Sequence, residues 1–131
     1  MKITDVKIEK FYIELTEPFK VAFAEITHSV SILIKIQTDE GIEGYGEAAP
    51  FAPVTGETAE GTIEILQLFR QGLIGKNPLE IEKLHAMMDN LAHGCGSAKC
   101  AVDIALYDIM GKVMGQPLYR VLGGYQSEVQ N

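Results

Sequence analysis

The sequence is poor in arginine and cysteine and has no long apolar run. Only two of its 131 residues are arginine, and eleven basic residues against eighteen acidic ones give a formal net charge of −7. Nucleic acids and anionic membrane surfaces are bound by clustered Lys and Arg, so this balance argues against both as partners. No apolar run approaches the roughly 20 residues of a membrane-spanning helix, and the first residues lack a signal-peptide core.

The two cysteines form no recognisable motif. Cys95 and Cys100 fit neither a CxxC pair nor a disulfide framework. We therefore expect two reduced thiols in a cytoplasmic protein, with Cys100 in the core beside apolar neighbours.

The length suits a single domain. Apolar residues make up 47% and charged residues 22% of the chain, which is typical of a packed globular domain. A chain of this size buries roughly two-thirds of its unfolded surface and needs no disulfide or metal for stability. It is too short for a (β/α)₈ barrel, which takes about 250 residues.

The first fifty residues predict an antiparallel meander. Alternating apolar side chains indicate strands at about 2–15, 29–38 and 42–48. A hairpin turn at 39–41, with Gly41 at a positive φ, joins the last two. The alternation is lost over residues 16–28, where Pro18 ends the first strand, and we predict an irregular loop there.

Helical periodicity replaces the alternation after residue 55. Helices are predicted at about 57–72, 78–91 and 97–114, with Thr55, Asn77 and Ser97 as N-caps. A short helical turn follows at 117–122. The third helix is apolar nearly all round, so it should be enclosed on most sides; its acids are expected to pair along the helix, Asp108 with Lys112 and Asp103 with Lys99. Three strands followed by a three-helix bundle define an α+β fold.

No motif for catalysis or metal binding is present. Residues 44–49 match the loose dinucleotide pattern GxGxxA, but Pro50 and Pro53 follow where a helix must begin. The three histidines are too scattered for metal ligation, and no nucleophile lies in a readable relation to a base. We predict neither a catalytic nor a metal-ligating residue in this chain.

Two proline-containing segments carry apolar side chains outside the regular pattern. These are residues 16–28 and 49–56, with Phe19, Phe23 and Phe51 the largest of them. Apolar loop residues are uncommon unless something covers them. They form either a small local core or a pair of flaps that close on a ligand or another domain.

Four stretches together resemble a known family. Residues 41–48 (GIEGYGEA), 54–58 (VTGET), 97–108 (SAKCAVDIALYD) and 117–124 (PLYRVLGG) resemble the N-terminal capping domain of the enolase superfamily. The subgroup is that of the muconate-lactonising enzymes, and the chain is most similar to its dipeptide epimerases, such as those acting on L-Ala-D/L-Glu. The resemblance implies a capping domain over residues 1–124, followed by a lead-in to a barrel at 125–131.

The resemblance also implies a reaction that needs residues outside this chain. In the family, a lysine removes the proton α to a carboxylate, and Mg²⁺ stabilises the resulting ene-diolate. All these groups lie on the barrel, so the 131 residues alone are expected to show no turnover and to bind no Mg²⁺. The implied partners are the barrel, a dipeptide substrate and further copies of the protein in a homo-oligomer.

Family members fold the two flap segments over the mouth of the barrel, which suggests a set of substrate contacts here. Members acting on Ala-Glu dipeptides usually carry an arginine where Ala24 stands, and Lys20 lacks its bidentate fork. A non-acidic dipeptide side chain is therefore expected, and Glu25 leaves a cationic one open. The expected substrate-binding residues are Phe19, Lys20, Phe23, Ala24, Glu25, Phe51, Val54 and Thr55.

Two alternatives to a dipeptide epimerase remain. One is the capping domain of a muconate cycloisomerase or an o-succinylbenzoate synthase. The other is a stand-alone α+β interaction module.

Overall fold

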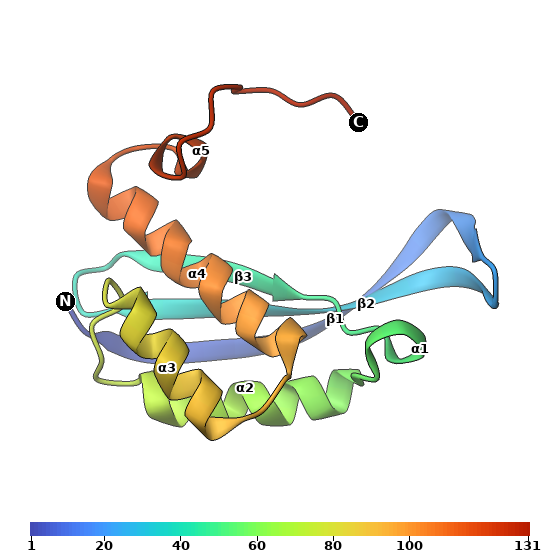
Figure 1. Cartoon of the computed structure of the whole chain (residues 1–131), viewed down its shortest axis with the longest axis horizontal. Helices are drawn as coiled ribbons and strands as arrows, with labels where there is room; N and C mark the ends of the chain where they lie inside the picture. The colour runs from blue at the N-terminus through green and yellow to red at the C-terminus, as the bar shows by residue number, and fades with distance from the viewer.

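The structure is a computed structural model that describes residues 1–131, and it contains one open three-stranded sheet (Figure 1). The strands are β1 (Ile3–Val21), β2 (Ala24–Thr38) and β3 (Glu43–Ala48), in the spatial order β1-β2-β3 and antiparallel throughout. The turn between β2 and β3 has Gly41 at φ 76°, as its sequence predicts. The expected meander and the α+β class are both confirmed.

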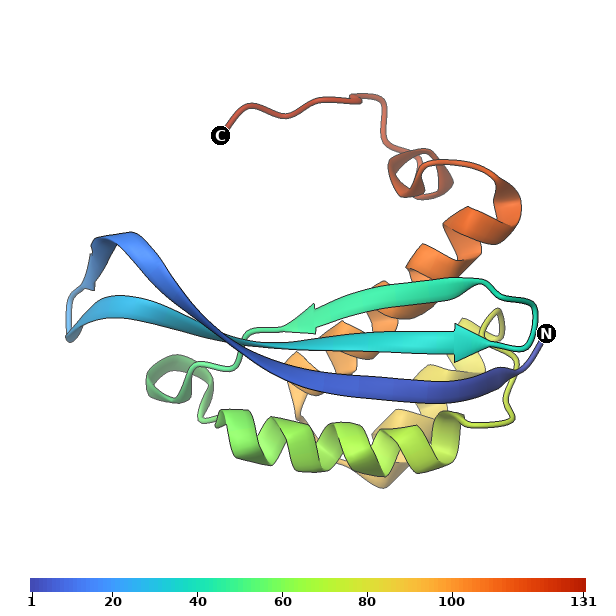
Figure 2. The same cartoon turned by 180° about the vertical axis from the view of Figure 1, so that it is seen from behind.

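Helices cover one face of this sheet and leave the other face open, as the view from behind shows (Figure 2). The three long helices are α2 (Ala59–Leu73), α3 (Ile81–Leu91) and α4 (Gly96–Met114). The single turns α1 (Ala52–Thr55) and α5 (Leu118–Val121) precede and follow them. None of these helices is both long and apolar enough to cross a lipid bilayer.

The core lies between the sheet and the three long helices. Ile32, Ile34 and Ile36 point to the helical layer and are fully buried, as the period of two in a strand requires. They meet Phe69 of α2 and Leu106 of α4, which are also fully buried. The alternation of β2 and the helical stripes thus form one continuous apolar core.

The prediction of an irregular loop over residues 16–28 is wrong. Strands β1 and β2 continue as a two-stranded ribbon, with Phe19 opposite Ile26 and Val21 opposite Ala24, and only residues 22–23 turn. The ribbon projects well beyond β3 and twists out of the plane of the sheet (Figures 1 and 2). Alternation fails as a signal here because the ribbon has no buried face, and Pro18 lies in the irregularity between Glu14 and Phe19.

The predicted helix starts also need correction. Thr58, not Thr55, caps α2, and its hydroxyl accepts a hydrogen bond from the backbone N–H of Gly61 (3.0 Å). Asn77 forms a local turn by accepting from the N–H of Leu79 (3.0 Å), and α3 begins only at Ile81. The two predicted caps, Thr55 and Asn77, instead form hydrogen bonds within their own loops before the helix begins.

Helix α4 lies unusually close to β3, and two glycines permit this approach. A Cβ atom on Gly46 would stand 1.8 Å from the carbonyl oxygen of Ala101, and one on Gly44 would stand 2.1 Å from that of Ala105. Small residues on both partners therefore set the distance between helix and strand.

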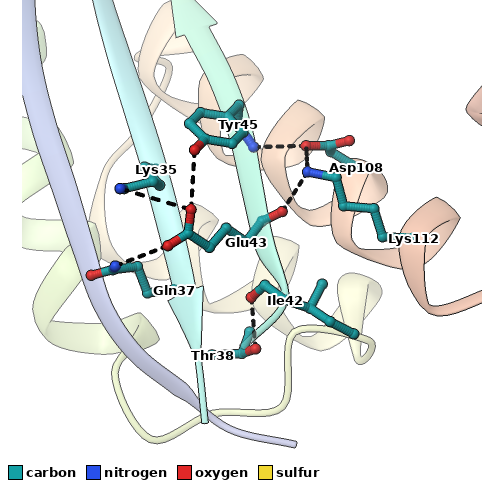
Figure 3. A network of polar contacts seen from close by, with 8 residues as sticks. All are labelled: Lys35, Gln37, Thr38, Ile42, Glu43, Tyr45, Asp108 and Lys112. Atoms are coloured by element: carbon teal, nitrogen blue, oxygen red, sulfur yellow. Dashed lines mark hydrogen bonds and ion pairs between the residues drawn. The ribbon is translucent and has the colours of Figure 1, made fainter. Parts of the chain in front are cut away.

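Charged residues of α4 also bond the outer edge of β3 (Figure 3). The Asp108 carboxylate accepts from the backbone N–H of Tyr45 (2.9 Å), and the Lys112 ammonium donates to the carbonyl of Glu43 (2.6 Å). Asp108 and Lys112 also pair with one another at 2.9 Å, as their spacing predicts. Hydrogen bonds from Gln37 and Tyr45 hold the pKa of the Glu43 carboxyl below its ordinary value.

Two other expectations for α4 are wrong. Asp103 pairs with His85 of α3 rather than with Lys99, and Lys99 pairs with Asp89 of α3 (2.8 Å). Cys100 is exposed rather than in the core. The face of α4 that carries these residues is turned toward α3 and solvent, since the opposite face packs on the sheet.

Candidate functional site

A groove lies where the ribbon leaves the sheet. One wall is the ribbon and the other is the segment that follows β3, and the volume of the open groove is about 740 Å³. This is within the size of small-molecule sites in proteins, roughly 300–1,000 Å³. Its lining comprises Leu15, Thr16, Glu17, Phe19, Ala24, Glu25, Ile26, Thr27, His28, Ser29, Val30, Ala49, Pro50, Phe51 and Pro53.

Four of the eight expected substrate-binding residues are part of the lining of this groove. These are Phe19, Ala24, Glu25 and Phe51, and they come from three separate stretches of the chain. The other four stand outside the lining. Lys20 is exposed opposite Glu25, Val54 is 68% exposed, Thr55 bonds its own loop, and Phe23 lies at the ribbon tip.

Two aromatic contacts shape the ribbon beside the groove. The rings of Phe23 and Phe51 stack with their centroids 6.5 Å apart, which joins the ribbon tip to the opposite wall. Tyr12 stacks on His28 across the two strands at 4.5 Å. Phe23 therefore contacts the groove wall through Phe51, although Phe23 itself is not part of the lining.

The segment carrying Phe51 is anchored from a distance by Glu57. The Glu57 carboxylate accepts from both the backbone N–H and the hydroxyl of Ser97, each at 3.1 Å. These bonds cap the N-terminus of α4, where Cys95 offers no side-chain cap. Thr55 adds a local bond by donating to the carbonyl of Phe51 (3.1 Å). The sequence predicts that the Ser97 side chain caps this helix, but in the structure the Glu57 carboxylate is the capping group and Ser97 donates to it.

The groove carries more negative than positive charge. Its ionisable lining residues are Glu17, Glu25 and His28, and neither lysine nor arginine is among them. Such a surface favours apolar or cationic groups and repels a carboxylate.

Sequence reasoning missed Glu17 and His28 as lining residues. His28 shares a strand face with Val30, because side chains two apart in a strand point the same way. A longer second strand would have placed it beside the groove. Glu17 had no such signal, since it stands in the irregular stretch between Glu14 and Phe19.

The chain offers no cluster of side chains for a metal centre. No three His, Cys, Asp or Glu side chains converge on a point that could hold a cation. The Mg²⁺ that the family implies therefore does not fit any set of residues in this chain. What the groove can do is cover a ligand, exclude water from it and contact its apolar part.

A three-stranded meander with a helical layer and a grooved, projecting ribbon defines a capping type of α+β domain. The chain belongs to the family described as mandelate racemase / muconate lactonizing enzyme, N-terminal domain, which it matches over residues 3–123. This is the N-terminal domain of the enolase superfamily, as the four sequence stretches predict.

Relatives with known activities include several epimerases and racemases. The chain is 45% identical over 129 residues to the hydrophobic dipeptide epimerase of Enterococcus faecalis, covering 98% of this chain and 36% of that protein. It is 44% identical to the N-succinyl-L-Arg/Lys racemase of Bacillus cereus, with 98% and 35% covered. The chain thus spans about a third of the length of these relatives.

Solved structures agree in fold. A dipeptide epimerase from Enterococcus faecalis V583, complexed with Mg and the dipeptide L-Leu-L-Tyr, aligns with a TM-score of 0.95 over 98% of this chain and 36% of that one. A dipeptide epimerase from Cytophaga hutchinsonii, complexed with Mg and D-Ala-L-Val, aligns with a TM-score of 0.94 at 37% identity, over 98% and 35%.

Proposed function

We propose that residues 1–124 are the capping domain of a Mg²⁺-dependent dipeptide epimerase that acts on dipeptides with a non-acidic side chain. The groove between the ribbon and the Phe51 segment then covers the substrate's variable end. The observation that carries this proposal is the combination of family membership with a groove that lacks any basic side chain.

The groove supports the non-acidic preference by its composition. Ala24 stands where the resemblance places an arginine in enzymes acting on Ala-Glu, and a methyl group cannot pair with a carboxylate. Phe19 and Phe51 supply apolar surface beside it, while Glu17 and Glu25 disfavour an anionic substituent. The dipeptides in the complexes of the two relatives above, L-Leu-L-Tyr and D-Ala-L-Val, also carry no acidic side chain.

We infer that this chain contributes substrate binding, while residues outside it contribute the chemical groups of the reaction. The reaction moves a proton at the carbon α to a carboxylate, and Mg²⁺ would stabilise the negative charge that develops there. Acid, base and metal ligands would come from residues outside these 131. This chain would orient the dipeptide and exclude water.

The test is a substrate panel with the full-length protein that carries this chain. Dipeptides of one series, such as L-Ala-L-Leu, L-Ala-L-Lys and L-Ala-L-Glu, are incubated with Mg²⁺ in D₂O, and exchange of the α-proton is followed by NMR. We expect exchange with the apolar or cationic dipeptide and little with the acidic one. Exchange confined to L-Ala-L-Glu would contradict the substrate class, and no exchange with any dipeptide would contradict the epimerase.

A substitution at position 24 tests the role of the groove directly. Ala24→Arg should raise the kcat/KM for L-Ala-L-Glu about tenfold or more relative to L-Ala-L-Leu, since it adds a charge-assisted bond to the carboxylate. Ala24→Gln adds similar bulk without charge and is the matched control. If both variants change the preference equally, size rather than charge decides it.

The same panel also tests the racemisation of an N-succinyl amino acid. An N-succinyl amino acid is included because one relative is an N-succinyl-L-Arg/Lys racemase at 44% identity. The 131-residue chain alone should catalyse no exchange with any of these compounds.

A further inference from the structure

The outward backbone groups of the two edge strands, β3 and β1, differ in how they are hydrogen-bonded. At the β3 edge, Asp108 and Lys112 satisfy the outward N–H of Tyr45 and the outward carbonyl of Glu43 (Figure 3). At the start of β1, the Ile3 N–H and carbonyl bond Lys76 and Gly75, and the Val6 carbonyl accepts from Arg70 (3.1 Å). Helix α2 continues beside β1 as far as Lys10, whose ammonium pairs with Glu60 of that helix, but no further hydrogen bond reaches the outward backbone groups of β1.

The uncovered part of this edge runs from Lys10 to Glu14, and we call it the open edge. Every residue in it is exposed, and three of them are large apolar residues: Phe11 is 41%, Tyr12 64% and Ile13 51% exposed. The C-terminal segment beyond α4 lies on the β3 side of the sheet, away from the first half of β1, and the ribbon half of β1 crosses β2 toward that side (Figures 1 and 2). Exposed edges that carry apolar side chains are templates for a further strand.

The direction of the backbone groups on the open edge follows from Val6. Its carbonyl points away from β2, and the pairing with β2 is regular from Asp5 to Glu14. Because backbone groups of alternate residues point to the same side, the N–H and C=O groups of Lys10, Tyr12 and Glu14 also point outward. Six polar groups are therefore presented along this edge.

The sequence of the open edge is complementary to itself. We propose that it pairs antiparallel with the open edge of a second copy of this chain, with Tyr12 opposite Tyr12 of that copy. In this register each Lys10 faces the Glu14 of the other copy, and each Phe11 faces the other Ile13. Opposite charges and apolar pairs directly across a strand pair both stabilise it.

Neighbouring registers lack this agreement. A shift of two residues in one direction places Lys10 opposite Tyr12 and Glu9 opposite Ile13. The shift in the other direction places Lys10 opposite Thr16 and Glu14 opposite Tyr12. Only the register centred on Tyr12 joins the two charges, and it also matches the outward residues, since Lys10, Tyr12 and Glu14 have the same parity.

The charged groups are free to form these pairs. Glu14 makes no ion pair within the chain, and Lys10 bonds only the exposed Glu60 (2.9 Å), which leaves two of its three N–H groups. The paired copies would form one continuous six-stranded sheet. The proposal does not depend on the enzymatic function, because it rests on the edge alone.

Charge reversal tests the register. The association constant of the full-length protein is measured by sedimentation equilibrium for Lys10→Glu, Glu14→Lys and the double variant. Each single variant should weaken the dimer about tenfold, because two like-charge contacts replace two attractive ones, and the double variant should recover most of the loss. Glu60→Gln removes the other partner of Lys10 and should leave the dimer unchanged.

Cross-linking provides a second measurement that does not rest on charge. In a background of Cys95→Ser and Cys100→Ser, Tyr12→Cys places the two introduced thiols opposite each other, within the Cα separation of a disulfide. Oxidation should produce a covalent dimer, while Glu47→Cys on β3 should not. Single variants that associate like the parent, or equal cross-linking at the two positions, would overturn the proposal, and the edge charges would then serve only to prevent strand pairing. Circular dichroism of every variant shows whether it folds.

Discussion

At the residue scale, the closest fit in the molecule is at the two glycines of β3. A side chain on either would collide with the backbone of α4 rather than with a flexible group, so the helix itself would have to move. Helix and strand share the apolar core, and such a movement would open it. These positions therefore control how α4 packs on the sheet.

Gly46→Ala should destabilise the fold by about 1–3 kcal/mol or more, as overpacking of a filled core does. The free energy of urea unfolding measures the effect. Gly96→Ala is the control, because nothing lies within 4 Å of its added Cβ and alanine favours a helix. If Gly46→Ala were as stable as the parent, the close approach of α4 to β3 would be wrong.

A second prediction at this scale concerns Asp5. Hydrogen bonds from Arg70 and from the backbone N–H of Val6 hold the pKa of its carboxyl below the ordinary value. The folded state thus favours the ionised form. The resulting stability is present above the unfolded pKa and is lost as the pH falls through the folded one.

Asp5→Asn should accordingly lower the urea midpoint at neutral pH and have a smaller effect as the pH falls from about 6 to about 3. The pair is partly exposed, at 43% and 35%, so the effect is modest and should shrink with added salt. The comparison of parent and variant at each pH cancels contributions from the other carboxyls. A difference that grew on acidification would contradict the assigned role.

At the element scale, α4 depends on a cap that lies forty residues away. Glu57 satisfies both the N–H and the hydroxyl of Ser97, and it thereby ties the Phe51 wall of the groove to the start of α4. Loss of this cap should therefore affect both the stability of α4 and the position of the groove wall that contains Phe51.

Glu57→Ala should therefore cost about 0.5–2 kcal/mol of stability, the range of helix caps. Ser97→Ala should cost less, because the Ser97 N–H remains to bond the carboxylate. In a double-mutant cycle the two losses should not add, since both remove the same contact. Glu64→Ala, an exposed carboxylate of α2, is the control. Additive losses would show that Glu57 acts elsewhere.

At the scale of the whole molecule, the chain leaves apolar side chains uncovered along α4 and beyond it. Ile104 is 43%, Met114 57% and Leu122 63% exposed. A surface of this kind in a domain that covers another one is expected to be buried in the complete protein.

The isolated 131-residue chain should bind a hydrophobic dye, and Ile104→Lys with Met114→Lys should lower that binding. The same pair should reduce any self-association that arises from this surface. Dye binding at the level of a compact monomer would contradict an uncovered face.

The sequence by itself determined the elements whose apolar pattern has one buried side. Ile32, Ile34 and Ile36 predict β2 because alternate side chains enter the core, and Asp39 to Gly41 predict the turn because glycine tolerates a positive φ. The same is true of the helical periodicity over residues 57–72, where Phe69 is buried, and of the ion pair between Asp108 and Lys112. These signals are local, so they survive without knowledge of the fold.

Only the tertiary structure decided what depends on residues far apart in the chain. The ribbon over 16–28 is held by strand pairing without a buried face, so it leaves no hydrophobic pattern. Asp103 takes His85 from a neighbouring helix rather than Lys99 from its own, and Glu57 reaches Ser97. The groove likewise forms where three separate stretches meet. Such contacts are set by how the elements pack, and packing is a property of the assembled chain.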